Sequence, residues 1–220
     1  MRLFSSLIAF GFGVGIGAAN PIFVNNFSFE TLPAAGLTTT CVVATGCNYS
    51  YSTPIPGWNL MNVGQITGQL QPGTNAGNFA YFNYVPDGTT VAYTDQGTIY
   101  QTVSATVQAG ETYTLLVDVG LRNDGFPGAP VVELVIGNTV VTATGAAPPT
   151  GGWSTYRATY KATASDAGKS ITIQLSSATA QGDFDNVRLS DAPEPATNVL
   201  GILGLAGLLP VLRARRRKSA

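Results

Sequence analysis

The sequence predicts an all-β protein, an antiparallel β-sandwich, and three observations support this prediction. Between residues 20 and 191, apolar residues recur with a period of two, and no segment sustains a 3.6-residue apolar repeat. Clusters of Gly, Pro, Asn and Asp separate these alternating runs, as turns do between strands. Eight or more strands are expected in about 170 residues without an intervening helix, which is typical of a sandwich.

The strands are predicted from the alternating runs in chain order. They are expected over Ile22–Phe29, Thr98–Val107, Thr112–Leu121, Val131–Ile136, Asn138–Thr144, Trp153–Thr163, Ser170–Ser176 and Phe184–Ser190. Tyr113, Leu115 and Val117 illustrate the pattern, since alternate residues of a strand share a face. The Gly137-Asn138 pair predicts a tight hairpin turn. The Thr, Ser and Asn residues between the apolar positions fit a sheet face that contacts water.

The charged residues divide the chain into a body and two ends. Of eleven basic residues, Arg2 and five within Arg213–Lys218 lie at the ends. Between Asn20 and Asp191, five basic and eleven acidic residues leave a charge of −6, although the whole chain has a net charge of only −1. An acidic body with dispersed basic residues argues against nucleic acid as a partner.

Histidine is absent from the sequence, and there are only two cysteines. The absence of histidine excludes Ser-His-Asp and Cys-His catalysis and histidine-based zinc sites. Cys41 and Cys47 lie close together in a Gly/Thr/Ala-rich segment, which in an oxidising compartment predicts one small disulfide loop.

The first 19 residues have the features of a secretory signal peptide. Arg2 precedes the apolar segment Leu3–Gly17, and small residues follow it, so cleavage is expected after Ala19. The Sec machinery and signal peptidase are therefore expected partners.

The C-terminal segment 192–220 contains a motif, an apolar run and a basic tail. Pro193-Glu194-Pro195 is followed by a short predicted transmembrane helix over residues 198–212. A basic tail then acts as a membrane stop, through Arg213, Arg215, Arg216, Arg217 and Lys218. This order resembles the PEP-CTERM sorting signal, whose tail is also called the ice-binding protein C-terminal domain.

The PEP-CTERM resemblance implies cleavage near Pro193-Glu194-Pro195 by an exosortase of a Gram-negative bacterium. The chain is then expected to pass through the inner membrane to the cell surface or the extracellular matrix. A plain C-terminal membrane anchor is the alternative, and it also places residues 20–191 outside the cytoplasm.

A second resemblance covers the body. Asn25–Glu30, Ile55–Trp58, Tyr100–Thr102 with Gly110–Leu115, and Asp183–Leu189 resemble, in order, four segments of galactose-binding-like jelly rolls. The resemblance implies one jelly-roll domain over residues 20–191. Many such domains bind carbohydrate, which makes exopolysaccharide an expected partner.

Aromatic and polar residues are the candidates for such a ligand site, because sugars bind aromatic faces and hydrogen-bonding side chains. The candidates are Tyr81, Tyr84, Tyr93, Tyr100, Trp153, Tyr156 and the turn residues Arg122, Asn123 and Asp124. The alternative for each aromatic side chain is a place in the core.

Acidic residues suggest two further sites. The jelly-roll resemblance implies a structural Ca²⁺ bound by Glu30 and Asp185, assisted by Asp183; alternatively, these acids cap turns or face water. Asp183 and Asp185 share a strand face and would suit a carboxylate-dependent hydrolase. The resulting prediction is an exported, non-catalytic protein that binds carbohydrate. A structural matrix protein and a hydrolase are the alternatives.

Overall fold

The computed structural model describes residues 18–61, 66–73, 80–124, 126 and 128–193. The predicted signal peptide, apart from its last two residues, and the predicted helix and basic tail at the C-terminus lie outside the described residues. Within the described ranges, none of the helical segments has the length and apolarity needed to cross a membrane. Residues Ala19–Ala192 form one structural unit.

The unit consists of strands and one short 3₁₀ helix. In chain order, the elements are β1 (Asn20–Ile22), β2 (Thr39–Thr40), β3 (Asn48–Tyr49), β4 (Asn59–Leu60), β5 (Ile66–Gln71), β6 (Val91–Asp95), β7 (Thr98–Thr106), β8 (Glu111–Gly120), β9 (Pro130–Ile136), β10 (Thr139–Thr142), β11 (Trp153–Lys161), η1 (Ala164–Asp166), β12 (Ser170–Ser177) and β13 (Gln181–Pro193).

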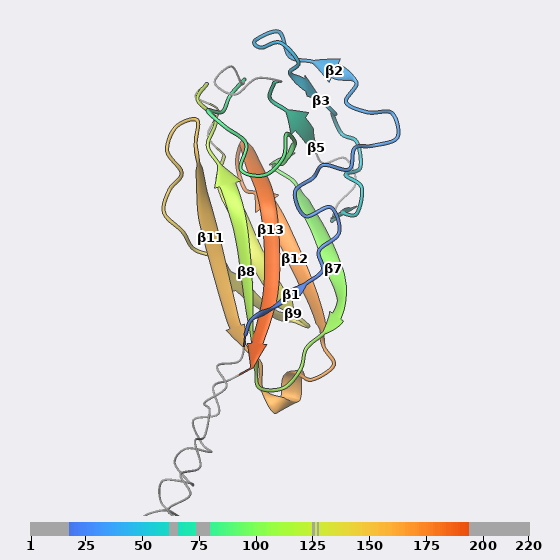
Figure 1. Ribbon diagram of the computed structural model, residues 1–220, viewed down its shortest axis with the longest axis vertical. Coiled ribbons are helices and arrows are strands. Elements are labelled where there is room, and N and C mark those ends of the chain that lie inside the picture. Colours follow the sequence, from blue (N-terminus) through green and yellow to red (C-terminus); the bar gives the residue numbers. More distant parts are fainter. Residues whose placement is uncertain (1–17, 62–65, 74–79, 125, 127, 194–220) are drawn as a thin grey trace, which may run out of the picture. The chain divides into compact units, whose positions relative to one another are not determined.

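The strands form two antiparallel sheets. The larger sheet has the order β11-β8-β13-β6-β5-β3-β2, and β1 also pairs with β13. The smaller sheet has the order β10-β9-β12-β7-β4. Figure 1 shows β8, β11 and β13 in one layer and β7, β9 and β12 in the other. The predicted antiparallel β-sandwich is therefore confirmed.

The core lies between the two sheets and follows the period-two pattern. Leu115, Val117 and Val119 of β8 are completely buried, as are Ile171 and Ile173 of β12. These side chains belong to one hydrophobic cluster with residues from both sheets. Burial of alternate residues is what holds each strand in register, because a shift by one residue would expose the apolar face.

The N-terminal strand was predicted wrongly. β1 ends at Ile22, and the chain turns between Asn25 and Phe29. Asn26 and Phe29 have left-handed backbone angles, with φ of 48° and 60°, which a continuous strand does not allow. The Asn26 side chain stabilises the turn, because its Oδ1 accepts the N–H of Thr31 and its Nδ2 donates to the Pro56 carbonyl.

The larger sheet also carries strands that the alternation did not predict. All the side chains of β5 between its two ends are buried, and in β6 only the last residue, Asp95, is not. A second hydrophobic cluster explains the burial on the face turned away from the smaller sheet. It comprises Cys41, Cys47, Leu70, Ala80, Phe82, Val91, Tyr93 and Trp153. Cys41 and Cys47 form the predicted disulfide.

Candidate functional site

The outer face of the larger sheet holds the candidate site. Strands β6 and β13 pair so that Asp95 lies opposite Gln181 and Tyr93 lies opposite Asp183. Directly opposed residues in an antiparallel pair project to the same face. The core residue Phe184 projects to the other face, so Gln181 and Asp183 face away from the smaller sheet.

A cavity of about 270 Å³ opens on this face. Its lining combines four tyrosines and a phenylalanine with two aliphatic and three polar side chains. The lining residues are Tyr49, Tyr51, Ile66, Leu70, Tyr81, Tyr93, Asp95, Arg122, Phe126 and Gln181. An apolar pocket with a few convergent polar groups is the usual form of a small-molecule site.

Tyr93 is fixed in the wall of this pocket. Its hydroxyl donates to the carbonyl of Ser50 over 2.5 Å. Burial raises the pKa of Tyr93, and Tyr49, Tyr51 and Asp183 nearby raise it further, so the ring stays neutral. The opposite residue of β5 is Gly68, where a Cβ would lie 2.2 Å from the Ser50 carbonyl oxygen and 2.9 Å from the Tyr93 side chain. Glycine at this position therefore makes room for the tyrosine.

Arg122 brings a cation into the pocket, and its position is closely defined. Its guanidinium lies over the Tyr81 ring, 3.8 Å from the ring centroid, and 5.4 Å from the centroid of Phe126. It also donates twice to Asp124, from Nε over 3.1 Å and from Nη2 over 2.5 Å. This ion pair leaves Arg122 with little net charge to offer to a ligand.

Asp183 lies beside these lining residues and is only 1% exposed. Burial raises the pKa of Asp183 to about 7, although hydrogen bonding to Gln181 and the charge of Arg122 oppose the rise. The Gln181 amide donates to Oδ1 of Asp183 over 2.7 Å. A buried carboxyl group whose pKa lies near neutrality can give and take a proton, which is what a general acid must do.

Asp185, two residues further along β13, has different partners. It accepts the N–H groups of Asp87, over 2.9 Å, and Asn186, over 2.7 Å. Burial raises the pKa of Asp185 to about 8, and the carboxylates of Asp87 and Glu30 also raise it. Glu30 itself accepts the N–H groups of Thr89 and Thr90.

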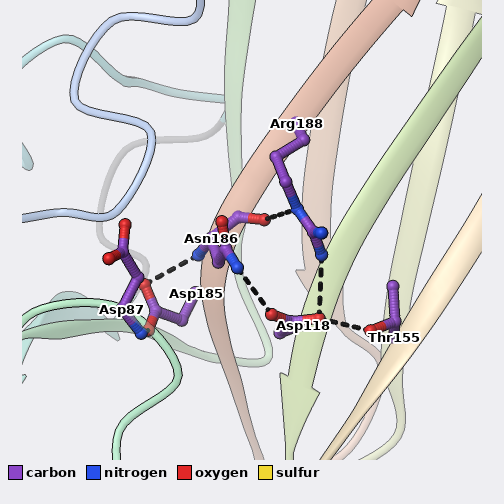
Figure 2. Close-up of polar contacts among 6 residues, drawn as sticks. All are labelled: Asp87, Asp118, Thr155, Asp185, Asn186 and Arg188. Atoms are coloured by element: carbon purple, nitrogen blue, oxygen red, sulfur yellow. Dashed lines mark hydrogen bonds and ion pairs between the residues drawn. The ribbon is translucent and has the colours of Figure 1, made fainter.

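Beyond Asp185, a polar network crosses from β13 to β8 and β11. Figure 2 shows Asp118 of β8 accepting hydrogen bonds from Asn186, Arg188 and Thr155. Part of this network borders a second hollow, of about 210 Å³, which also contacts Tyr84 and Trp153. Since three donors already satisfy the Asp118 carboxylate, it is a structural group of the sheet rather than a free acid.

The structure separates the predicted ligand-site residues into two groups. Tyr81 and Arg122 line the larger cavity and Asp124 holds Arg122, whereas Tyr84 and Trp153 border the second hollow. Trp153 is only 7% exposed and packs against Phe82. Asn123 donates its backbone N–H to the Tyr81 carbonyl. Tyr93 lines the larger cavity, while Tyr100 and Tyr156 do not line either cavity.

The predicted calcium ligands also have separate environments. Glu30 and Asp185 both lie near Asp87, whereas Asp183 bonds to Gln181 beside the pocket. Among the residues described by the structure, no group of three or more His, Cys, Asp or Glu side chains is arranged as a metal site. Sequence reasoning missed Gln181 and Asp95, because nothing local distinguishes them from other polar residues of a strand.

The fold and this pocket define a β-sandwich protein with an aromatic pocket and a buried acid beside it on the outer face of one sheet. Over residues 20–190 the sequence matches the family described as HpiC1-like, HpiC1 cyclase, and the chain belongs to that family. No curated protein matches the sequence.

Solved structures agree with this assignment. One is the Stig cyclase Fisc from Fischerella sp. TAU in complex with (3Z)-3-(1-methyl-2-pyrrolidinylidene)-3H-indole; it is 28% identical, with 80% of this chain and 99% of that chain covered and a TM-score of 0.65. Another is a cyclase from Fischerella sp. TAU in complex with 4-(1H-indol-3-yl)butan-2-one. It is 27% identical, the match covers 80% of this chain and 98% of that chain, and the TM-score is 0.63.

The family corrects the functional prediction. A non-catalytic carbohydrate-binding or matrix protein was expected, and this was wrong, because the matching family and the similar structures are cyclases. The error arose because the absence of histidine was given too much weight. A buried aspartate can act as an acid without histidine, but its burial is visible only in the folded chain.

Proposed function

We propose that this protein is a cyclase whose pocket binds an unsaturated indole compound and whose Asp183 supplies the proton that starts ring closure. The observation that carries this proposal is the position of a buried carboxyl group beside an aromatic pocket that contains no histidine. The family and the indole ligands bound to two similar cyclases support the reaction type and the substrate class.

The proposed reaction conserves all atoms. Asp183 donates its proton to a double bond of the substrate, and the resulting cation is attacked by an electron-rich carbon of the same molecule. A new carbon–carbon bond closes the ring, and loss of a proton to the Asp183 carboxylate restores the acid. The product is therefore an isomer of the substrate.

The pocket's side chains suit such an intermediate. The faces of Tyr49, Tyr51, Tyr81 and Tyr93 carry partial negative charge, which stabilises a neighbouring cation. A substrate that fills the cavity would displace water from it, and this would protect the cation from being trapped as an alcohol.

The test is the Asp183→Asn variant, which keeps the size of the side chain but lacks an acidic proton. Indoles with unsaturated C3 side chains would be incubated with the purified protein, and products of unchanged mass but altered retention would be counted. We expect Asp183→Asn to lower the rate at least about 100-fold. Asp191→Asn is the matched control, because Asp191 lies on the same strand but pairs with Asn20. Full activity of Asp183→Asn would refute the proposal.

We further propose that a Ca²⁺ ion binds near Glu30 and Asp185. The support is the fully buried Asp185 carboxylate, which has two acidic neighbours and, among the described residues, only N–H partners. The ion would need backbone carbonyl oxygens as additional ligands. When bound, it would join the loops around residues 30 and 87 to β13.

Thermal unfolding tests the calcium site. Ca²⁺ should raise the Tm of the unmodified protein after EDTA treatment, and Mg²⁺ should raise it less. The Asp185→Asn variant should show no Ca²⁺ response, whereas Asp191→Asn should respond as the unmodified protein does. An equal response of Asp185→Asn would place the ion elsewhere.

We also propose that the cyclase is exported and processed at its C-terminus by an exosortase. The Cys41–Cys47 disulfide supports an oxidising destination. Replacing Pro193-Glu194-Pro195 by alanines should leave the uncleaved chain in the inner membrane, which fractionation and immunoblotting would detect. Unchanged release of the altered chain would contradict an exosortase substrate.

A further inference from the structure

Asp95 is an acidic residue of the pocket lining that lies at the end of β6, between two other strands of the larger sheet. It pairs with Gln181 of β13 on one side and with Ile66 of β5 on the other, and all three residues line the cavity. The chain leaves this sheet directly after Asp95, since β7 belongs to the smaller sheet. Two neighbouring strands therefore fix the backbone of Asp95 at the cavity wall, and its side chain is only partly buried.

The carboxylate of Asp95 differs from the other acids near the pocket, because it has no partner among the described residues. Within those residues it makes neither a hydrogen bond nor an ion pair. By contrast, Asp124 accepts two hydrogen bonds from Arg122, and Asp183 accepts one from Gln181. Asp95 therefore presents an unused acceptor and a negative charge at the wall of the cavity.

Arg122, the cationic side chain of the lining, is engaged elsewhere. Its Nε and Nη2 donate to Asp124, and its Nη1 donates to Oε1 of Gln181 over 2.9 Å. Gln181 lies directly opposite Asp95, but its amide nitrogen donates to Asp183 over 2.7 Å. The Gln181 amide is thus occupied at both ends, and the charge of Asp95 stays uncompensated within the described part of the pocket.

Aromatic rings surround the same space. Tyr49, Tyr51, Tyr81 and Tyr93 share the lining with Asp95. Ring faces attract cations at short range, and an unpaired carboxylate attracts them over a longer distance. A metal ion would need several oxygen ligands, whereas Asp95 is the one carboxylate of the described lining. The cavity of about 270 Å³ therefore favours a bulky organic cation over a neutral group of the same shape.

We infer that Asp95 is the counter-ion of the cation that forms from the substrate during ring closure. The inference rests on the proposed function, because a neutral substrate becomes positively charged only when the reaction begins. Asp95 then stabilises the charged intermediate more than the substrate, and such a difference accelerates a reaction. Asp95 itself neither gives nor takes a proton.

Two indoles of nearly the same shape but different charge test the inference without turnover. One carries a 2-(trimethylammonio)ethyl group at C3, and the other carries a 3,3-dimethylbutyl group there. The ammonium charge is permanent, so it does not depend on the pH of the buffer. At low ionic strength the purified full chain should bind the charged indole about five- to thirtyfold more tightly. This preference should shrink as NaCl is raised from about 0.05 M to about 0.5 M, because Asp95 is partly exposed and salt screens its charge.

Substitutions of Asp95 test the assignment to this residue. Asp95→Asn keeps the size of the side chain but removes its charge, and it should lower the preference for the charged indole at least about fivefold. Asp95→Glu keeps the charge and should retain most of the preference. The matched control Asp191→Asn removes a carboxylate near the other end of β13, where Asp191 pairs with Asn20, and it should leave the preference unchanged.

The kinetics of ring closure give a second readout. Asp95→Asn should lower kcat about tenfold while KM stays within about twofold, because a neutral substrate gains little from the charge. Damage to the shape of the pocket would instead raise KM and weaken the binding of both indoles.

The outcomes separate this inference from the proposed function. Equal affinities of the unmodified protein for the two indoles, or an unchanged preference in Asp95→Asn, would overturn the inference and leave Asp183 as the proposed acid. A preference that does not respond to salt would also overturn it, and that measurement needs no variant. If the unmodified protein binds neither indole, both the inference and the proposed substrate class are wrong. Circular dichroism and Tm values would show that each variant is folded.

Discussion

Asp166 and Asp183 are both buried, yet their pKa values move in opposite directions. Asp166 accepts hydrogen bonds from Lys169, the side chain and backbone N–H of Thr163, and Tyr160, and these donors hold its pKa well below the usual range. Asp183 has one amide donor, and the rise in its pKa caused by burial outweighs the lowering caused by that hydrogen bond. Depth of burial and the number and charge of the donors together decide whether such an aspartate is a structural anion or an acid.

The low pKa of Asp166 predicts a pH-dependent contribution to stability. A carboxyl whose pKa is lower in the folded state stabilises the fold above its unfolded pKa of about 3.9, and this contribution is lost as the pH falls further. The free energy of unfolding should therefore be higher for the unmodified protein than for Asp166→Asn at pH 7. Denaturant titrations should show this difference shrinking below about pH 4.

Lys169→Met provides the control for this prediction. It removes the ammonium group that lies 2.7 Å from Asp166 and is the largest cause of the lowered pKa. The loss of stability on acidification should then be smaller and should be complete at a higher pH than in the unmodified protein, because the folded-state pKa of Asp166 moves closer to its unfolded value. A difference between Asp166→Asn and the unmodified protein that stays constant with pH would show that the charge of Asp166 does not matter.

Strand β13 is the element on which the site depends most. It contributes Phe184, Val187 and Leu189 to the core, and it contributes Asp183 and Asp185 to the opposite face. The core residues are spaced by three and then two positions, so one extra residue is accommodated between Phe184 and Val187. This spacing and the left-handed backbone of Asn186 at the same place, with φ of 50°, are typical of a β-bulge.

The bulge predicts the response to substitution of Asn186. Asn186→Ala removes the 2.9 Å hydrogen bond to Asp118 and places alanine in a left-handed conformation, which together should cost about 2–3 kcal/mol. Glycine adopts a positive φ without strain, so Asn186→Gly should lower the free energy of unfolding by only about 1–2 kcal/mol, which corresponds to the lost hydrogen bond. Chemical denaturation measures both values.

Asn138→Ala is the matched control, because Asn138 is exposed in the β9–β10 hairpin and lacks a positive φ. It should change stability by no more than about 0.5 kcal/mol. If Asn186→Ala proved as mild as Asn138→Ala, the bulge would not depend on asparagine.

At the level of elements, alternation predicted the strands with one buried face. β7, β8, β9, β11 and β12 occupy nearly the predicted ranges. β5 and β6 escaped prediction because both of their faces are buried, including the polar residues Thr67, Gln69 and Thr94. A strand that is covered on both sides loses the alternation that would reveal it.

At the scale of the whole molecule, the outer face of the larger sheet is covered over β5 and β6, whereas its outward residues on β11, such as Arg157 and Thr159, are exposed. The segment from Cys41 to Cys47 connects β2 and β3, which lie next to β5 at one edge of the larger sheet. Tyr49 of β3 forms part of the pocket lining. Cys41 and Cys47 belong to the same hydrophobic cluster as Tyr93 and Trp153. The disulfide therefore helps to hold one side of the pocket.

Removal of the disulfide should lower stability and loosen this side of the pocket. For its short loop we expect Cys41→Ser/Cys47→Ser to lose about 2 kcal/mol, or about 4–8 °C in Tm. Binding of 4-(1H-indol-3-yl)butan-2-one should weaken in parallel. Reduction of the unmodified protein by dithiothreitol is the control and should reproduce both effects. A Tm within about 1 °C of the original would show that the cluster holds the segment without the bond.

The sequence by itself determined the sandwich, most of its long strands and the pairing of its two cysteines, because period-two burial and loop closure are local properties of the chain. It also supplied the individual residues Tyr81, Arg122 and Asp183 as candidates. Only the tertiary structure decided that they meet on the outer face of one sheet, where β6 and β13 pair. Burial by residues distant in sequence raises the pKa of Asp183, and this turns a predicted metal ligand into the proposed acid of a cyclase.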